Sequence, residues 1–201
     1  MTRHADADVR RNQVAAALVR VVAERGLARA TLADVAERAG VSVGLVQRYF
    51  RTKDELLRFG VEYVYRRSEE RVQQVAVSLP VRGTVVRLLE TFLPLDPERR
   101  DELRVWLSLI QASLSDPRMA AVHQDATLRM VDGVAEALAG AQRAGELTAG
   151  TDTAAEAAAL VAFVDGLCLH HAATGTRFEP AALRAALTQY VDRLFDGGAA
   201  R

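Results

Sequence analysis

The stretch that most constrains the fold runs from Thr31 to Phe50, TLADVAERAGVSVGLVQRYF. Its first half carries apolar residues at helical spacing, and Thr31 followed by Asp34 is a near relative of the capping box that starts a helix. Gly40 follows the last apolar residue, where a helix often ends in a left-handed conformation. Ser42 is then suited to cap another helix. We therefore expect two short helices joined by a tight turn.

This pair of helices has the residue types of a helix-turn-helix unit. Ala36 is the small residue, Gly40 the turn glycine and Val46 the interior β-branched residue that such a unit needs. The second helix of a helix-turn-helix unit enters the major groove of DNA. The stretch therefore predicts DNA binding by its second helix.

Helical periodicity also dominates the rest of the 201 residues, and no stretch alternates for long with a period of two. We expect residues 1–8 to be a disordered arm and Val9–Arg25 to be a first helix. A capping box at Thr52 and Glu55 starts a fourth helix at Lys53 without a linker. Further helices are expected at about residues 53–78, 82–93, 97–114, 118–144, 153–173 and 180–195.

The predicted fold class is all-α, with two domains. Residues 1–52 form a three-helix N-terminal domain with the helix-turn-helix unit, and residues 53–201 form a six-helix C-terminal domain. Net charge is zero overall, but residues 1–60 carry 11 basic and 7 acidic side chains. This weakly basic head on an acidic body fits a DNA-binding module joined to a domain with another task.

Cysteine content and terminal composition limit the cellular setting. The single cysteine, Cys168, excludes an internal disulfide and a cysteine-based zinc site. The polar N-terminus is unlike a signal peptide, and we expect no apolar run near the ~20 residues that cross a bilayer. The expected localisation is cytoplasmic, with no membrane partner.

The last two helices are rich in alanine and leucine, and small residues allow another helix to approach closely. Two such helices and their twofold copies predict a four-helix interface in a homodimer. The alternative is that both helices close the core of a monomer. The predicted interface residues are Ala158, Leu160, Phe163, Leu167, Leu187, Tyr190, Val191 and Leu194.

Residues from about 10 to 60 resemble the DNA-binding domain of TetR-family transcriptional regulators. The resemblance is carried by TLADVAERAGVS, then by Tyr49-Phe50 followed by Lys53 and Leu56. Asp165-Gly166-Leu167 also looks familiar from these regulators. The resemblance implies a helical ligand-binding and dimerisation domain in the remainder, and a repressor released from its palindromic operator by a small molecule.

The resemblance also implies roles for single residues in binding double-stranded DNA. The implied DNA-binding residues are Thr31, Ser42, Val43, Gly44, Gln47, Arg48, Tyr49 and Lys53. Gln and Arg side chains bridge adenine and guanine edges, respectively. Val43, Leu45 and Gln47 depart from the residues common in the family, so the preferred sequence is left open.

A small-molecule effector is expected inside the C-terminal domain, and no cofactor is expected. Aromatic side chains suit a cation such as a quaternary ammonium, with Glu102 and Asp165 as possible counter-charges. Each of these residues has plain core packing as its alternative. The candidate effector-binding residues are Tyr63, Phe92, Trp106, Gln111, Met130, Phe163 and His170.

Two other classes of protein compete with this interpretation. Cys168 and His171 lie three residues apart, as a cysteine–histidine nucleophile requires, but no orienting group or motif accompanies them. His170 and His171 diverge around a helix and do not hold a metal together. We therefore expect no enzyme and no metal. A helical adaptor whose head binds protein instead of DNA is the remaining alternative.

Overall fold

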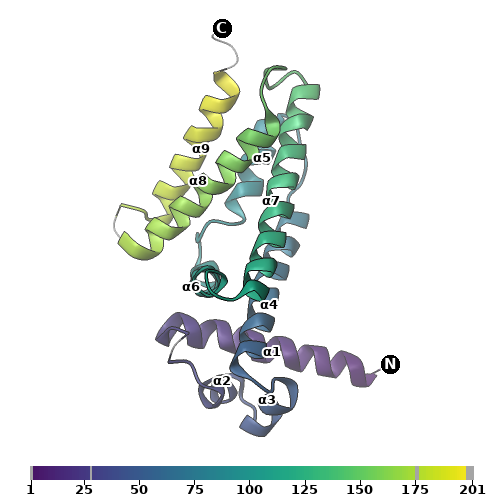
Figure 1. Ribbon diagram of the computed structural model, residues 1–201. Helices are drawn as coiled ribbons and strands as arrows, with labels where there is room; N and C mark the ends of the chain where they lie inside the picture. The colour runs from purple at the N-terminus through teal and green to yellow at the C-terminus, as the bar shows by residue number, and fades with distance from the viewer. Residues whose placement is uncertain (1, 28, 175–176, 198–201) are drawn as a thin grey trace. The chain divides into compact units, whose positions relative to one another are not determined.

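The computed structural model describes residues 2–27, 29–174 and 177–197, with the backbone alone for residues 2–7. Over these residues the chain has nine α-helices and no strand, so the all-α prediction is confirmed (Figure 1). The helices are α1 (Thr2–Arg25), α2 (Leu32–Ala39), α3 (Val43–Tyr49), α4 (Lys53–Gln73), α5 (Val81–Glu90), α6 (Pro97–Ser113), α7 (Pro117–Arg143), α8 (Thr153–Thr174) and α9 (Pro180–Asp196).

Two predicted helix boundaries are wrong. α1 begins at Thr2, so residues 2–8 are helical and not a disordered arm; residue 1 lies outside the described residues. Neither glycine nor proline precedes Val9, and nothing local ends the helix. α4 ends at Gln73, short of Ser78. The Thr84 hydroxyl accepts the Ser78 N–H at 3.1 Å and donates to the Ser78 carbonyl at 2.9 Å, which fixes this connection outside the helix.

The helices gather into two compact units. The first unit comprises Met1–Arg67 and Arg100–Ala120, and the second comprises Ser68–Arg99 and Ala121–Arg201. The first unit thus contains most of α4 and of α6 together with α1, α2 and α3. The division into domains at residue 52 stays a prediction.

The first unit is built on α1, which packs against α2 (Figure 1). Its core contains fully buried aliphatic side chains of α1, α2 and α3, among them Val14, Val35 and Val46. Gln13 of α1 donates to the Ala39 carbonyl at the end of α2 over 2.6 Å. Arg104 of α6 donates to the Ala23 carbonyl near the end of α1 over 2.7 Å. These bonds satisfy carbonyls that helix ends leave without intrahelical partners.

The second unit packs α5 against α9 around buried leucines. The N-cap of α5 is Pro80, which makes no side-chain capping bond. Glu146 supplies the missing acceptor, because its carboxylate accepts the N–H groups of Val81 at 2.9 Å and Arg82 at 3.2 Å. Arg82 also pairs with Asp192 and Asp196 of α9, so a polar network fixes the start of α5.

α8 differs from what the sequence led us to expect. This helix of 22 residues has a mean hydropathy of 1.4 over its most apolar window and is long and apolar enough to cross a membrane, so the expectation that no such run occurs is wrong. One such helix is weak support for a membrane span, since the core helix of a globular protein has the same composition. α8 also carries the acidic residues Glu156 and Asp165.

Candidate nucleic-acid interface and effector region

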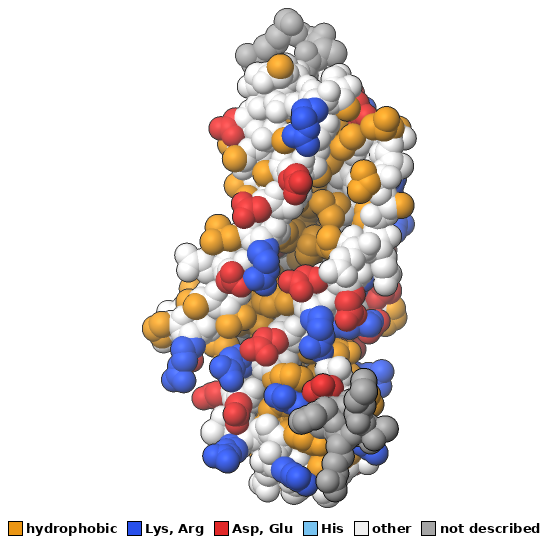
Figure 2. Space-filling view, turned by 90° about the vertical axis from the view of Figure 1, so that its right-hand side faces the viewer, with side chains coloured by type: hydrophobic (Ala, Val, Ile, Leu, Met, Phe, Trp, Pro, Cys, Tyr) orange, Lys and Arg blue, Asp and Glu red, His pale blue; other side chains and the backbone are white. Residues whose placement is uncertain are grey.

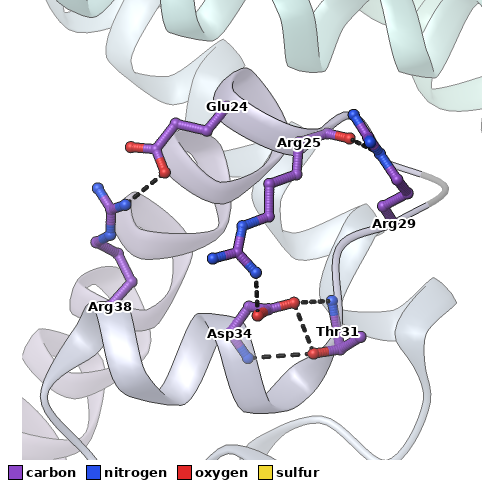
Figure 3. A network of polar contacts seen from close by, with 6 residues as sticks. All are labelled: Glu24, Arg25, Arg29, Thr31, Asp34 and Arg38. Atoms are coloured by element: carbon purple, nitrogen blue, oxygen red, sulfur yellow. Dashed lines mark hydrogen bonds and ion pairs between the residues drawn. The ribbon is translucent and has the colours of Figure 1, made fainter.

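The first helix of the predicted helix-turn-helix unit starts with the capping box expected from the sequence. The Asp34 N–H donates to Thr31 Oγ1 at 3.2 Å, and Asp34 Oδ2 accepts the Thr31 N–H at 3.0 Å (Figure 3). Thr31 Oγ1 also donates to Asp34 Oδ2 at 2.7 Å. This bond, then the bond from the Thr31 N–H and then the charge of Arg25, lower the pKa of Asp34. The N–H groups of Thr31 and Asp34, which have no partner within the helix, are therefore both hydrogen-bonded.

Ion pairs join the end of α1 to α2 next to this cap. Arg25 pairs with Asp34, and Arg38 pairs with Glu24 (Figure 3). Arg29 donates from Nε to the Arg25 carbonyl at 2.9 Å. Glu24, Arg25 and Arg38 are exposed, so each pair adds little to stability. Their charges cancel locally, and on the face drawn in Figure 2 basic and acidic side chains are likewise interspersed.

The turn between α2 and α3 has the predicted geometry. Gly40 adopts φ 65° and ψ 34°, the left-handed conformation expected at the end of α2. Its N–H donates to the Glu37 carbonyl at 3.1 Å, and the Val41 N–H donates to the Ala36 carbonyl at 3.0 Å. Ser42 caps α3, since its Oγ accepts the Leu45 N–H at 3.2 Å. Local sequence signals therefore fix where α2 ends and where α3 begins.

α3 presents the predicted base-reading residues on one face. Val46 is fully buried, whereas Val43, Gly44, Gln47 and Arg48 are exposed. Val43 and Gln47 are four residues apart, as are Gly44 and Arg48, so the four residues share one side of the helix. The exposed fraction of Val43 is 39%. This side of α3 has the size and chemistry to contact base edges in a major groove.

The residues predicted to contact phosphates are Thr31, Tyr49 and Lys53, and Ser42 is the predicted cap of α3. Thr31, Ser42 and Lys53 are exposed, and Tyr49 is half-buried. Lys53 is the first residue of α4, whose start is capped by Thr52, because Thr52 Oγ1 accepts the Glu55 N–H at 3.1 Å. A helix start favours anions through its free N–H groups and its dipole.

The candidate effector residues are divided between the two units. Tyr63, Trp106 and Gln111 belong to the first unit, and the other four belong to the second. Five of the seven are half-buried, whereas Gln111 and His170 are exposed. The five half-buried residues are Tyr63, Phe92, Trp106, Met130 and Phe163.

The histidines of α8 have packing roles in the structure. The His170 ring stacks on Phe178 with the ring centroids 5.0 Å apart, and His171 Nδ1 lies 2.6 Å from the Phe178 carbonyl oxygen. The thiol of Cys168 donates to the Phe92 carbonyl at 3.5 Å, and burial raises its pKa to about 12. A thiol held in its protonated form is a poor nucleophile. Among the described residues no cluster of histidine, cysteine and acidic side chains is suited to a metal ion.

Comparisons with known proteins match both parts of the chain. The family described as bacterial regulatory proteins, tetR family, matches residues 14–58. The family described as BetI-type transcriptional repressor, C-terminal, matches residues 81–196, more than half of the chain. The chain belongs to the TetR family.

TetR-family proteins of similar length resemble the chain from end to end. The transcriptional regulator PksA of Bacillus subtilis is 29% identical over 195 residues, covering 96% of this chain and 94% of that protein. BetI of Paraburkholderia phymatum is 27% identical, with 96% of each covered. A Rhodococcus transcriptional regulator of known structure has a TM-score of 0.82 at 29% identity, covering 93% of this chain and 96% of that one.

A further solved structure contains a ligand. It is a regulator from Saccharomonospora viridis in complex with choline, with a TM-score of 0.78 at 25% identity, covering 92% of this chain and 96% of that one. TetR-family proteins are transcriptional regulators that bind DNA and small-molecule effectors, and they are not enzymes. The prediction of a TetR-family regulator of the repressor type is therefore confirmed.

Within this TetR-family chain, the predicted interface residues fall into two groups. Leu160, Leu167, Leu187 and Val191 are buried in the single chain. Ala158 is exposed, and Phe163, Tyr190 and Leu194 are half-buried. The alanines that the sequence singles out on α8 belong to an exposed row of small and apolar residues. This row, called the alanine stripe below, comprises Ala155, Ala158, Ala159, Ala162, Leu169 and Ala173.

Asp165 lies at the edge of the alanine stripe. Among the described residues no hydrogen bond or ion pair with its carboxylate is found. Burial raises its pKa to about 6. A carboxylate withdrawn from water without a partner is destabilised in its charged form, so it is suited to receive a cation or a proton.

Proposed function

We propose that this TetR-family protein is a homodimeric repressor that binds a palindromic operator in double-stranded DNA in the cytoplasm and is released by a small cationic effector. The observation that carries the proposal is the match of residues 81–196 to BetI-type repressors, next to a helix-turn-helix unit with intact caps. A dimer with two such units reads two half-sites related by twofold symmetry.

Base reading is assigned to the exposed side of α3. Gln47 suits the N6 and N7 positions of adenine, and Arg48 suits the O6 and N7 positions of guanine. The exposed side chain of Val43 suits contact with a thymine methyl group. Thr31, Ser42, Tyr49 and Lys53 are assigned to phosphates, and Gly44 allows close approach of the backbone. The support is that all of these residues except the half-buried Tyr49 are exposed.

Dimerisation is assigned to α8 and α9. Only 33% of the most apolar window of α8 is buried within the single chain, which leaves the alanine stripe for a partner helix. The proposed interface therefore consists of the alanine stripe with Phe163, Tyr190 and Leu194 beside it. The four buried leucine and valine residues support this surface from beneath. A second copy of the same surface would complete a four-helix arrangement.

The proposed effector is a small quaternary ammonium compound. The support is the choline complex of the Saccharomonospora viridis regulator and the BetI-type match. Aromatic faces attract such cations, and the second unit, which contains Asp165, offers half-buried aromatic residues in Phe92 and Phe163. Asp165 is the proposed counter-charge.

Selection of genomic DNA fragments by the purified protein tests the DNA-binding part of the proposal. We expect enrichment of one palindrome upstream of the protein's own gene or of a neighbouring gene. Enrichment without a shared palindrome would favour the helical adaptor, and binding that does not weaken with salt would argue against DNA contact altogether.

Choline is the probe for the effector part. Choline added to the complex of protein and operator should release DNA, and operator DNA should weaken choline binding by the same factor. Operator binding that is unaffected by millimolar choline would remove choline from the candidates while leaving DNA recognition intact.

A further inference from the structure

The guanidinium of Arg11 lies against two aromatic rings in the first unit. Its Cζ is 4.7 Å from the centroid of the Phe59 ring and 5.8 Å from that of Phe50. The two rings are themselves 5.2 Å apart. Phe50 is the C-cap of α3, and Phe59 belongs to α4. One side chain of α1 therefore contacts both the end of the DNA-reading helix and the helix that follows it.

The two rings are the neighbours that compensate the buried part of the Arg11 guanidinium group. Its Nε is buried and finds no hydrogen-bond partner among the described residues. A guanidinium group that loses water at Nε requires compensation, and the faces of aromatic rings supply it. Phe50 is 1% exposed, so the contact reaches into the core at the end of α3.

Two further contacts hold α4 closely against α1. A Cβ added to Gly60 would lie 2.5 Å from Leu18 Cδ2, so α4 approaches α1 closely at this glycine. Further along α4, Arg66 Nη2 donates to Asn12 Oδ1 of α1 at 2.6 Å. These contacts fix α4 on α1, and Arg11 adds the end of α3 to the same contact surface.

We propose that Arg11 is a positioning residue for operator reading: it fixes the orientation of α3 on α1 and α4 and thereby sets the separation of half-sites that the dimer accepts. This inference rests on the proposed function, because a defined separation requires two linked readers. A rotation of α3 about its C-cap moves Val43 and Gly44 at its other end, so the loss of Arg11 broadens the range of accepted separations.

The test compares the matched variants Arg11→Met and Arg20→Met. Arg20 is exposed on the same helix, so both changes remove one positive charge and leave a long apolar side chain. Affinity is measured by fluorescence anisotropy for the selected palindrome and for duplexes with one base pair added or removed between the half-sites. We expect wild type and Arg20→Met to prefer the native separation, and Arg11→Met to lose roughly five- to tenfold of this preference.

The ratio of the affinity for the native separation to the affinity for the altered separations distinguishes a positioning role of Arg11 from general stabilisation of the fold. A merely structural role would lower affinity for all separations alike, so an unchanged preference in folded Arg11→Met overturns the inference. Arg11→Lys should keep part of the preference, because an ammonium also lies favourably over an aromatic face.

A second variant keeps the test decisive if Arg11→Met fails to fold. Phe59→Leu removes the ring and retains an apolar side chain, and it should broaden the preference in the same way; an unchanged preference overturns the inference. Wild-type protein that binds all separations equally would overturn the proposed palindromic reading, and this inference with it.

Discussion

The Phe163 ring of α8 lies 4.7 Å from the Tyr190 ring of α9, with 30° between the ring planes. Aromatic pairs in this range attract each other beyond the area that they bury. Both rings are half-buried and lie beside the alanine stripe. The pair therefore aligns α8 with α9 at the surface that we assign to the dimer.

Ala162→Glu should separate the dimer into monomers. The substitution places a long charged side chain at the centre of the alanine stripe, where helix approach requires small residues and an unpaired charge would be buried. Sedimentation equilibrium measures the result. Ala149→Glu, in the exposed turn before α8, is the control and should remain dimeric. A dimer of unchanged affinity in Ala162→Glu would exclude this surface.

The Thr31–Asp34 capping box should make stability depend on pH at the acidic end. The pKa of Asp34 is lowered in the folded state, so its charge stabilises the fold above the ordinary pKa of 3.8 and this contribution is lost as the pH falls through the folded value. Asp34→Asn should be less stable than wild type at pH 7, with the difference shrinking as the pH falls below 3.8. Urea unfolding at both pH values measures this, and a difference independent of pH would exclude a role for the charge.

Asp165 should change the dependence of stability on pH in the opposite direction to Asp34. Its pKa is raised to about 6, so the folded protein binds the proton more tightly than the unfolded chain does. The stability associated with this proton is fully present below the ordinary pKa of 3.8 and is lost as the pH rises through about 6. Asp165→Asn should therefore stabilise the protein at pH 7.5 by about 3 kcal/mol and much less at pH 4. Urea unfolding in the absence of choline measures the gain; equal effects at both pH values would contradict the raised pKa.

Phosphate and base contacts should be separable by mutation. Lys53→Ala and Tyr49→Phe should weaken binding to all duplexes alike, and Lys53→Ala should reduce the slope of log affinity against log salt by about 1. Gln47→Ala should instead change sequence preference at one position per half-site, by about 1–3 kcal/mol. Anisotropy titrations with operator and random DNA at several salt concentrations distinguish these outcomes. A Lys53→Ala protein with unchanged affinity for both duplexes would remove Lys53 from the phosphate contacts.

The features that could be predicted from the sequence are those set by a few neighbouring residues. Thr31 and Asp34 carry the capping signal within four positions, and Gly40 takes the left-handed conformation that its place after Ala39 indicates. The N-cap of α3 at Ser42 follows in the same way. In each case a backbone group at a helix end needs a partner, and the sequence shows which residue supplies it.

The features that the sequence could not reveal depend on contacts far along the chain. The end of α4 follows from the bonds between Thr84 and Ser78, and neither residue alone has a terminating signal. The contact of Arg11 with Phe50 and Phe59 requires the packed helices. Periodicity also could not separate interface from core in α8, because this helix is apolar on nearly all sides and both faces look alike.

The central claim is that a dimer reads a palindromic operator. Its most direct test compares the affinity for the selected palindrome with the affinity for the same duplex with one half-site scrambled. We expect the intact palindrome to bind two chains, and the scrambled duplex to bind at least about a hundredfold more weakly, since losing one half-site removes several base contacts of 1–3 kcal/mol each. Equal affinity for the two duplexes, with one chain bound to each, would contradict the dimeric reading of a palindromic operator.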